Sequence, residues 1–181
     1  MAVQTRCLRL RFAKQEKIEA LLDACLEMVQ AGVDYALEHK VTATHSLVRA
    51  LYASLRQKHP KLHSQWVVKS LRTAAQIVHA FNYRKRKGLT KKDKPVVKRR
   101  RVYVDKSTFH FTWDGEVLRI TIPVIPKDPD PIVLEFRPHH KYRELVEAWW
   151  QGKADWGEPT LTPTSISIPL KFPAPQPYEP K

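Results

Sequence analysis

The sequence predicts an α+β fold in which helices interrupt an antiparallel β-barrel or sheet after its first strand. Two observations support this class. A short alternating segment opens the chain and is followed by long stretches with helical periodicity. Alternation then returns in the second half, which holds nearly all of the 14 Pro. Because a lone strand is unstable, we expect the first strand to pair with the later ones.

Residues 5–12 (TRCLRLRF) form the predicted first strand. Leu8, Leu10 and Phe12 share one face, and Cys7, Arg9 and Arg11 share the other. This pattern is typical of a half-buried strand with a basic outer face.

Three helices are predicted next, over about residues 15–39, 46–58 and 64–87. Ser46 is a plausible N-cap of the second helix, and Pro60 follows its end. The third helix has two distinct faces at about 100° per residue. Its apolar face holds Val67, Leu71, Ala74, Val78 and Phe81, and its polar face holds Gln65, Lys69, Arg72, Gln76 and Tyr83. A solvated surface is the plain interpretation of the polar face, and a binding face is the alternative.

Strands dominate the second half. Residues 109–122 predict a hairpin with a tight turn at Asp114-Gly115. A short strand (IVLEF), a helix over about 139–151 and a final strand (SISIPLKF) follow. We therefore expect a β-barrel domain from residues 1–13 and 95–173, a helical insertion over 14–94 that ends in a basic linker, and a Pro-rich exit tail over 174–181.

Most of the net charge of +14 lies in one segment, residues 84–101, which has eleven Lys or Arg and one Asp. Its cations are Arg84, Lys85, Arg86, Lys87, Lys91, Lys92, Lys94, Lys98, Arg99, Arg100 and Arg101. Such a run predicts a polyanionic partner, nucleic acid before an acidic membrane. A solvated or localisation-type basic loop is the alternative.

Sites for catalysis are scarce. Pro60 separates His59 from His63, Asp128 and Asp130 lie in a Pro-flanked loop, and no phosphate-binding or nucleophile motif occurs. Two Cys make structural zinc improbable. The opening charges argue against a signal peptide, and no apolar run could span a membrane. The three Trp at 149, 150 and 156 are read as core or interface before a ligand cage, and the hairpin aromatics as core.

Five segments together resemble the N-terminal half of insertion-sequence OrfB/TnpB proteins, transposon-encoded RNA-guided DNA nucleases similar to type V CRISPR effectors. They are RCLRLRF, the helix KIEALLDACLEMVQAGVDYAL, LHSQWVVKSLRTAAQIVHAF, KPVVKRRR before VDKSTFHFTWDG, and PTSISIPLKF. The resemblance implies a wedge-like β-barrel with a helical recognition insertion.

The resemblance also implies roles and partners. Gln65, Lys69, Arg72, Thr73 and Gln76 would face target-adjacent DNA, and the 84–101 cations with Arg9 and Arg11 would hold guide RNA and its heteroduplex with DNA. A RuvC-like nuclease half with its metal ions follows in that family, whereas this sequence stops at Lys181. We therefore expect no catalysis and no cofactor in this chain, and a place near the nucleoid in a prokaryotic cytoplasm. The alternatives are a stand-alone basic RNA- or DNA-binding protein and a part of an active transposase or nuclease.

Overall fold

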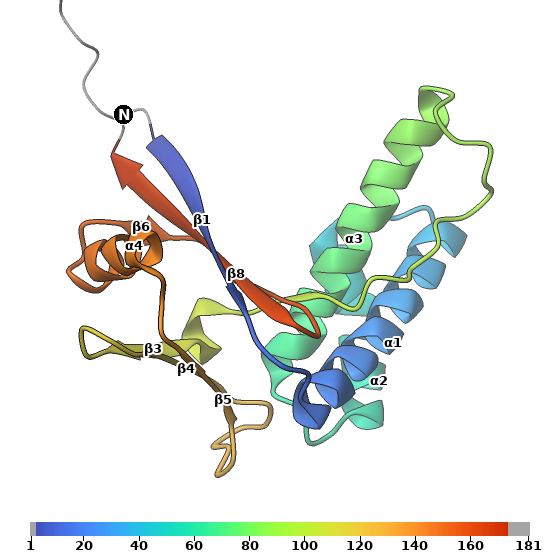
Figure 1. Ribbon diagram of the computed structural model, residues 1–181. Coiled ribbons are helices and arrows are strands. Elements are labelled where there is room, and N and C mark those ends of the chain that lie inside the picture. Colours follow the sequence, from blue (N-terminus) through green and yellow to red (C-terminus); the bar gives the residue numbers. More distant parts are fainter. Residues whose placement is uncertain (1–2, 174–181) are drawn as a thin grey trace, which may run out of the picture.

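The computed structural model describes residues 3–173, which form four α-helices and two antiparallel sheets (Figure 1). The α-helices are α1 (Glu16–Glu38), α2 (Thr44–Lys58), α3 (Ser64–Arg86) and α4 (His140–Trp150). The predicted α+β class and the four predicted helices are confirmed. The predicted tail, residues 174–181, lies outside the described part of the chain.

The larger sheet joins the two ends of the described chain. Strand β1 (Val3–Arg11) pairs antiparallel with β8 (Ser165–Pro173), and Leu8 lies opposite Ile168. On its other edge, β8 pairs with β6 (Asp155–Trp156) and β7 (Thr160–Leu161), and β7 pairs with β2 (Val102–Tyr103). The first strand therefore pairs with a late strand, as the sequence predicted.

The smaller sheet has the order β3 (His110–Trp113), β4 (Leu118–Ile122) and β5 (Ile132–Phe136). The predicted hairpin is present, but Trp113 pairs with Leu118, so the loop is longer than a two-residue turn. The Asp114 carboxylate accepts hydrogen bonds from the amides of Glu116 and Val117, which holds this wider loop. The two sheets remain separate and open over residues 3–173, so the expected barrel is not confirmed.

Helices α1 and α3 pack closely because Gly32 has no side chain. A Cβ at Gly32 would lie 2.7 Å from the Cβ of Ala74 and 3.1 Å from Cδ2 of Leu71. The predicted N-cap of α2 is wrong: the helix begins at Thr44, its N-cap is Ala43, and the amide of Ser46 already bonds the Ala43 carbonyl. His63 caps α3 by accepting a hydrogen bond from the amide of Gln65.

One hydrophobic core runs through the helices and both sheets. Ile18 and Leu71 come from the helices, Leu8 and Ile168 from the larger sheet, and Ile120 from the smaller sheet. Helix α4 is tied to β3 by the indole of Trp113, which donates to a Glu147 carboxylate oxygen at 2.5 Å. Among residues 3–173, no helix combines the length and the apolarity that crossing a bilayer requires.

Candidate nucleic-acid interface

The basic segment, residues 84–101, begins on the last turn of α3. Arg84, Lys85 and Arg86 are exposed there, where cations interact favourably with the negative end of the helix dipole. Gly88 follows the end of the helix with φ 68°, a left-handed conformation that favours glycine. Its amide donates a hydrogen bond to the Lys85 carbonyl, and the Leu89 amide donates one to the Arg84 carbonyl. The chain thus leaves α3 in a defined direction with its cations turned to solvent.

After this turn the segment runs back along the helices, and two contacts hold it there. Val97 is half-buried against the core, in a hollow of about 290 Å³ that Val29 of α1 and Ile77 of α3 also line. Arg100 bridges two carboxylates of α1, with Nη2 3.1 Å from Glu19 and Nη1 3.0 Å from Asp23. The basic segment is therefore anchored along α1 and α3.

The other cations of the segment are exposed and, within residues 3–173, have no ion-pair partner. They are Arg84, Lys85, Arg86, Lys87, Lys91, Lys92, Lys94, Lys98, Arg99 and Arg101. Tyr83 lies beside them, 48% exposed, and the Arg86 guanidinium is 5.9 Å from its ring centroid. The arrangement offers charge for phosphates and a planar ring on which a base could stack.

The polar face of α3 differs from its prediction, because four side chains form an ion-pair cluster there: Lys69, Arg72, Asp105 and Glu158. Lys69 Nζ lies 2.8 Å from Asp105 and also contacts Glu158, and Arg72 contacts the other oxygen of Glu158. Burial alone would raise the pKa of Asp105, but hydrogen bonds from Lys69 and Ser107 outweigh it and lower the pKa to about 2. For Lys69, burial opposes the charged form, yet its two carboxylate partners raise its pKa above the usual value.

This cluster corrects the prediction of an open polar face. Lys69 is only 7% exposed and Thr73 only 4%, and the Thr73 hydroxyl donates to the Lys69 carbonyl within the helix. Arg72 is half-buried, with its guanidinium 5.6 Å from the Tyr103 ring centroid. The physical reason is that β2 and the residues around Glu158 pack on this face. Gln65 is half-buried, and only Gln76 and Tyr83 remain exposed.

Sequence patterns could not find the acidic partners of the cluster. Glu158 lies 89 positions from Lys69, and no pattern in the sequence links either Glu158 or Asp105 to α3. Only the fold brings the two carboxylates to α3.

The predicted basic outer face of β1 is present. Arg9 and Arg11 are exposed and lack an ion-pair partner in the part of the chain that the structure describes, whereas Leu8 and Leu10 are buried. Cys7 is exposed on the same face as Arg9, and Cys25 is buried in α1, where burial raises its pKa to about 12.

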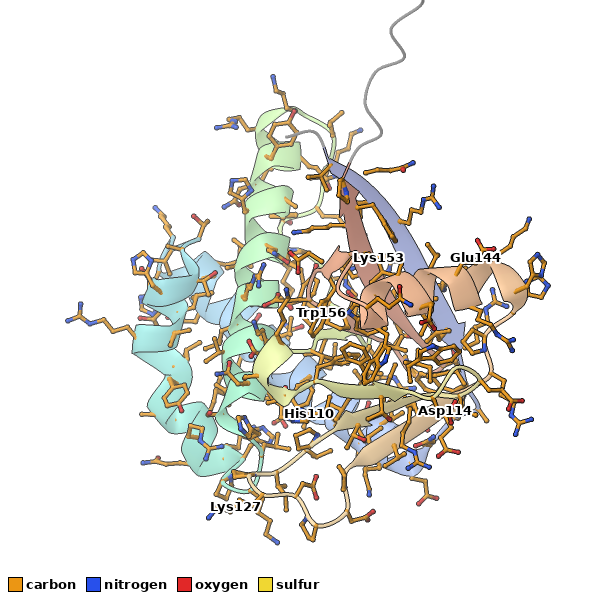
Figure 2. All side chains as sticks on the ribbon, turned by 90° about the vertical axis from the view of Figure 1, so that its left-hand side faces the viewer. His110, Asp114, Lys127, Glu144, Lys153 and Trp156 are labelled. Atoms are coloured by element: carbon orange, nitrogen blue, oxygen red, sulfur yellow. The ribbon has the colours of Figure 1, made fainter. Side chains whose placement is uncertain are left out.

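The aromatic side chains of the second half gather into one cluster. Phe111 stacks on Trp149 at 3.7 Å between ring centroids, and Phe109 lies 5.1 Å from Trp156. Phe109 and Trp149 are buried, as predicted for core residues, but Trp150 is 48% exposed. Lys106 lies over Trp156, which Figure 2 labels on the face that also carries His110 and Lys153.

The two carboxylates of the Pro-flanked loop make structural contacts within the protein. Asp128 accepts hydrogen bonds from the amides of Val124 and Asp130, and Asp130 pairs with Lys17 at 2.6 Å. In residues 3–173 no three His, Cys, Asp or Glu side chains come together in a way that could hold a metal ion.

Comparison with known proteins gives one family. No curated protein matches the chain. The model of the "Uncharacterized protein MJ0013 family" matches residues 21–121, more than half of the 181 residues. The match extends from α1 through α3 and the basic segment to β4, and it includes Lys69, Arg72 and Asp105 of the ion-pair cluster but not Glu158. The chain therefore belongs to the uncharacterized protein MJ0013 family.

Proposed function

We propose that the protein binds nucleic acid, and RNA above all, through the basic segment and Tyr83. One observation supports this most strongly: ten of the eleven cations in residues 84–101 have no acidic partner within the described residues, although the same fold neutralises Lys69 and Arg72. Clustered unpaired cations repel one another, and a polyanion relieves that repulsion while its condensed counterions are released.

A guide-RNA role follows from the resemblance to OrfB/TnpB proteins. In that proposal the two sheets would serve as a wedge-like barrel, the helices as its recognition insertion, and the basic segment as the support of guide RNA and heteroduplex. The chain would supply binding only, and a nuclease half would supply the metal-dependent cleavage. The other active role, as part of a transposase, would need carboxylates from a partner chain.

The experiment is a salt-dependent binding titration with single-stranded RNA, duplex DNA and an RNA–DNA heteroduplex, followed by fluorescence anisotropy. We expect steep loss of affinity with salt. Replacing Lys91, Lys92 and Lys94 by Gln should lower RNA affinity at least about tenfold and reduce the log–log salt slope by about 2.

The matched control replaces three exposed lysines elsewhere, Lys14, Lys61 and Lys153, and removes the same charge. It should leave the slope nearly unchanged. A wild-type slope near zero, or equal losses in both triple variants, would contradict the proposal.

A stand-alone RNA-binding role is favoured over DNA reading by the burial of Lys69 and Thr73. Of the residues expected to face DNA, Gln76 is the exposed one. Selection from random duplex DNA separates the two roles. Enrichment of a motif that Gln76→Ala abolishes would establish DNA reading, and unselective binding would support the stand-alone role.

A further inference from the structure

We propose a second phosphate-binding site, in a groove formed by the end of β1, the end of β5 and the start of α4. The groove has a volume of about 570 Å³, and its polar lining comes from Arg9, Arg11, Glu135, Arg137, His139 and Tyr142. We infer that it binds backbone phosphates of the same polynucleotide, and this inference rests on the proposed function.

Positive charge in this groove exceeds negative charge. Its three arginines are exposed, and Arg9 and Arg11 have no ion-pair partner among residues 3–173. Among the described residues that line it, the one acid is Glu135, which is already engaged by Arg119 on the neighbouring strand, with Nε 2.8 Å from the carboxylate. The groove therefore attracts anions.

Arg137 is available to a ligand even though it has a partner. Its guanidinium lies 3.6 Å from the Glu116 carboxylate, and both side chains are more than half exposed. Such a pair contributes little to stability, so a phosphate can take the place of Glu116 at small cost.

The donors match phosphate chemistry. Guanidinium groups bind two phosphate oxygens at once, which an ammonium group does not. The imidazole of His139 and the hydroxyl of Tyr142 add further possible donors from the start of α4. Four of these residues, Arg9, Arg11, Arg137 and His139, come from segments that only the folded structure brings together.

This groove is separate from the basic segment. In Figure 1, α4 and β5 lie on one side of the molecule, and the free end of α3 lies on the other. A polynucleotide that reaches both the groove and the cations at the free end of α3 must extend along the protein between them. The groove should therefore contribute to the binding of long strands and little to the binding of short ones.

The test uses the full chain and a single-stranded RNA with hydroxyl groups at both ends, so that every phosphate is a backbone phosphodiester. The groove variant is Arg9→Gln with Arg137→Gln. The control, Arg49→Gln with Lys61→Gln, removes the same charge from exposed positions on and after α2. Circular dichroism and thermal melting check that each variant folds.

For a long RNA, the groove variant should lose about tenfold in affinity and about 1.4 in salt slope, and the control should lose neither. For a short RNA, both variants should bind like the wild type. If the wild-type protein binds RNA and the groove variant has the same salt slope as the control variant, this inference is overturned and the proposed function is left intact.

A second measurement identifies the source of phosphate. Inorganic phosphate is titrated into the isotope-labelled wild type while amide and Arg side-chain resonances are followed. Small changes in the resonances of Arg9, Arg137 and His139 on addition of phosphate, which reverse when RNA displaces the phosphate, support the inference. Shifts with phosphate but no binding of RNA would overturn both the polynucleotide site and the proposed function.

Discussion

The first half of α3 and the segment that follows its last turn both carry cations, and they use them in opposite ways. Lys69 is buried between Asp105 and Glu158, whereas Arg84 and Lys91 are exposed without an acidic partner in residues 3–173. Lys69 and Arg84 lie on one continuous helix, so local sequence does not set the difference. The packing of the β-strands against α3 does.

The comparison teaches how to separate structural from binding charge. A buried charge is tolerated only where it is paired and hydrogen-bonded, and removing one partner leaves the other uncompensated. An exposed, unpaired cation contributes little to folding and remains free for a ligand. Structural cations should therefore show their effect in stability, and binding cations in affinity.

The largest effect on stability is expected for Lys69→Met. Loss of the ammonium group leaves two carboxylates facing each other beside α3, which should lower the free energy of unfolding by about 3 kcal/mol. Lys85→Met, on the same helix but exposed, should change it by less than about 0.5 kcal/mol.

Urea denaturation measures the free energy of unfolding of each variant. RNA titration should rank the two variants in the opposite order, by loss of affinity. Lys85→Met should weaken binding, and folded Lys69→Met should not. Equal stabilities for the two variants would show that the ion-pair cluster is not structural.

A smaller effect is expected from pH. The pKa of Asp105 is lowered from 3.8 to about 2, so its contribution to stability is present above about pH 4 and is lost as the pH falls toward 2. The stability difference between wild type and Asp105→Asn should therefore narrow by about 1 kcal/mol from pH 5 to pH 2, after allowance for solvent screening.

Denaturation at a series of pH values measures this difference. Asp93→Asn, at an exposed position of the basic segment, is the control for losing one carboxylate. A difference that stays constant down to pH 2 would show that the Lys69–Asp105 pair does not form.

The smallest effect compares two neighbouring arginines. Arg99 is exposed without an ion-pair partner in the described chain, and Arg100 pairs with Glu19 and Asp23. Arg99→Ala should reduce the RNA salt slope by about 0.7. Arg100→Ala should leave the slope unchanged, because Arg100 already pairs with two carboxylates of α1. The same slope change in both variants would remove the distinction between them.

Periodicity predicted the elements well, because burial repeats along each helix and strand. The pairing of β1 with a late strand also followed from the sequence, since one strand alone is unstable. The start of α2 did not, because Ala43 caps it without a side-chain hydrogen bond. The sequence also could not decide whether the strands close into a barrel, because closure depends on how the edges of two sheets meet.

The candidate site was predicted in part. The run of charge in residues 84–101 is visible without a structure, but the ion pairs of Lys69 depend on Asp105 and Glu158, which lie on distant segments. Angular position on a helix says which residues share a face, and it does not say what covers that face. For the same reason the sequence suggested Arg9 and Arg11 but not Arg137 and His139.

The pairing of β1 with β8 has a consequence for synthesis on the ribosome. The first strand emerges early, yet its partner is among the last described segments to be made. During that interval α1, α2 and α3 can already fold, while β1 presents an open edge. Its outward arginines, Arg9 and Arg11, would repel the same strand of a nascent neighbour, so the positive charge that we assign to RNA binding would also protect against misassembly.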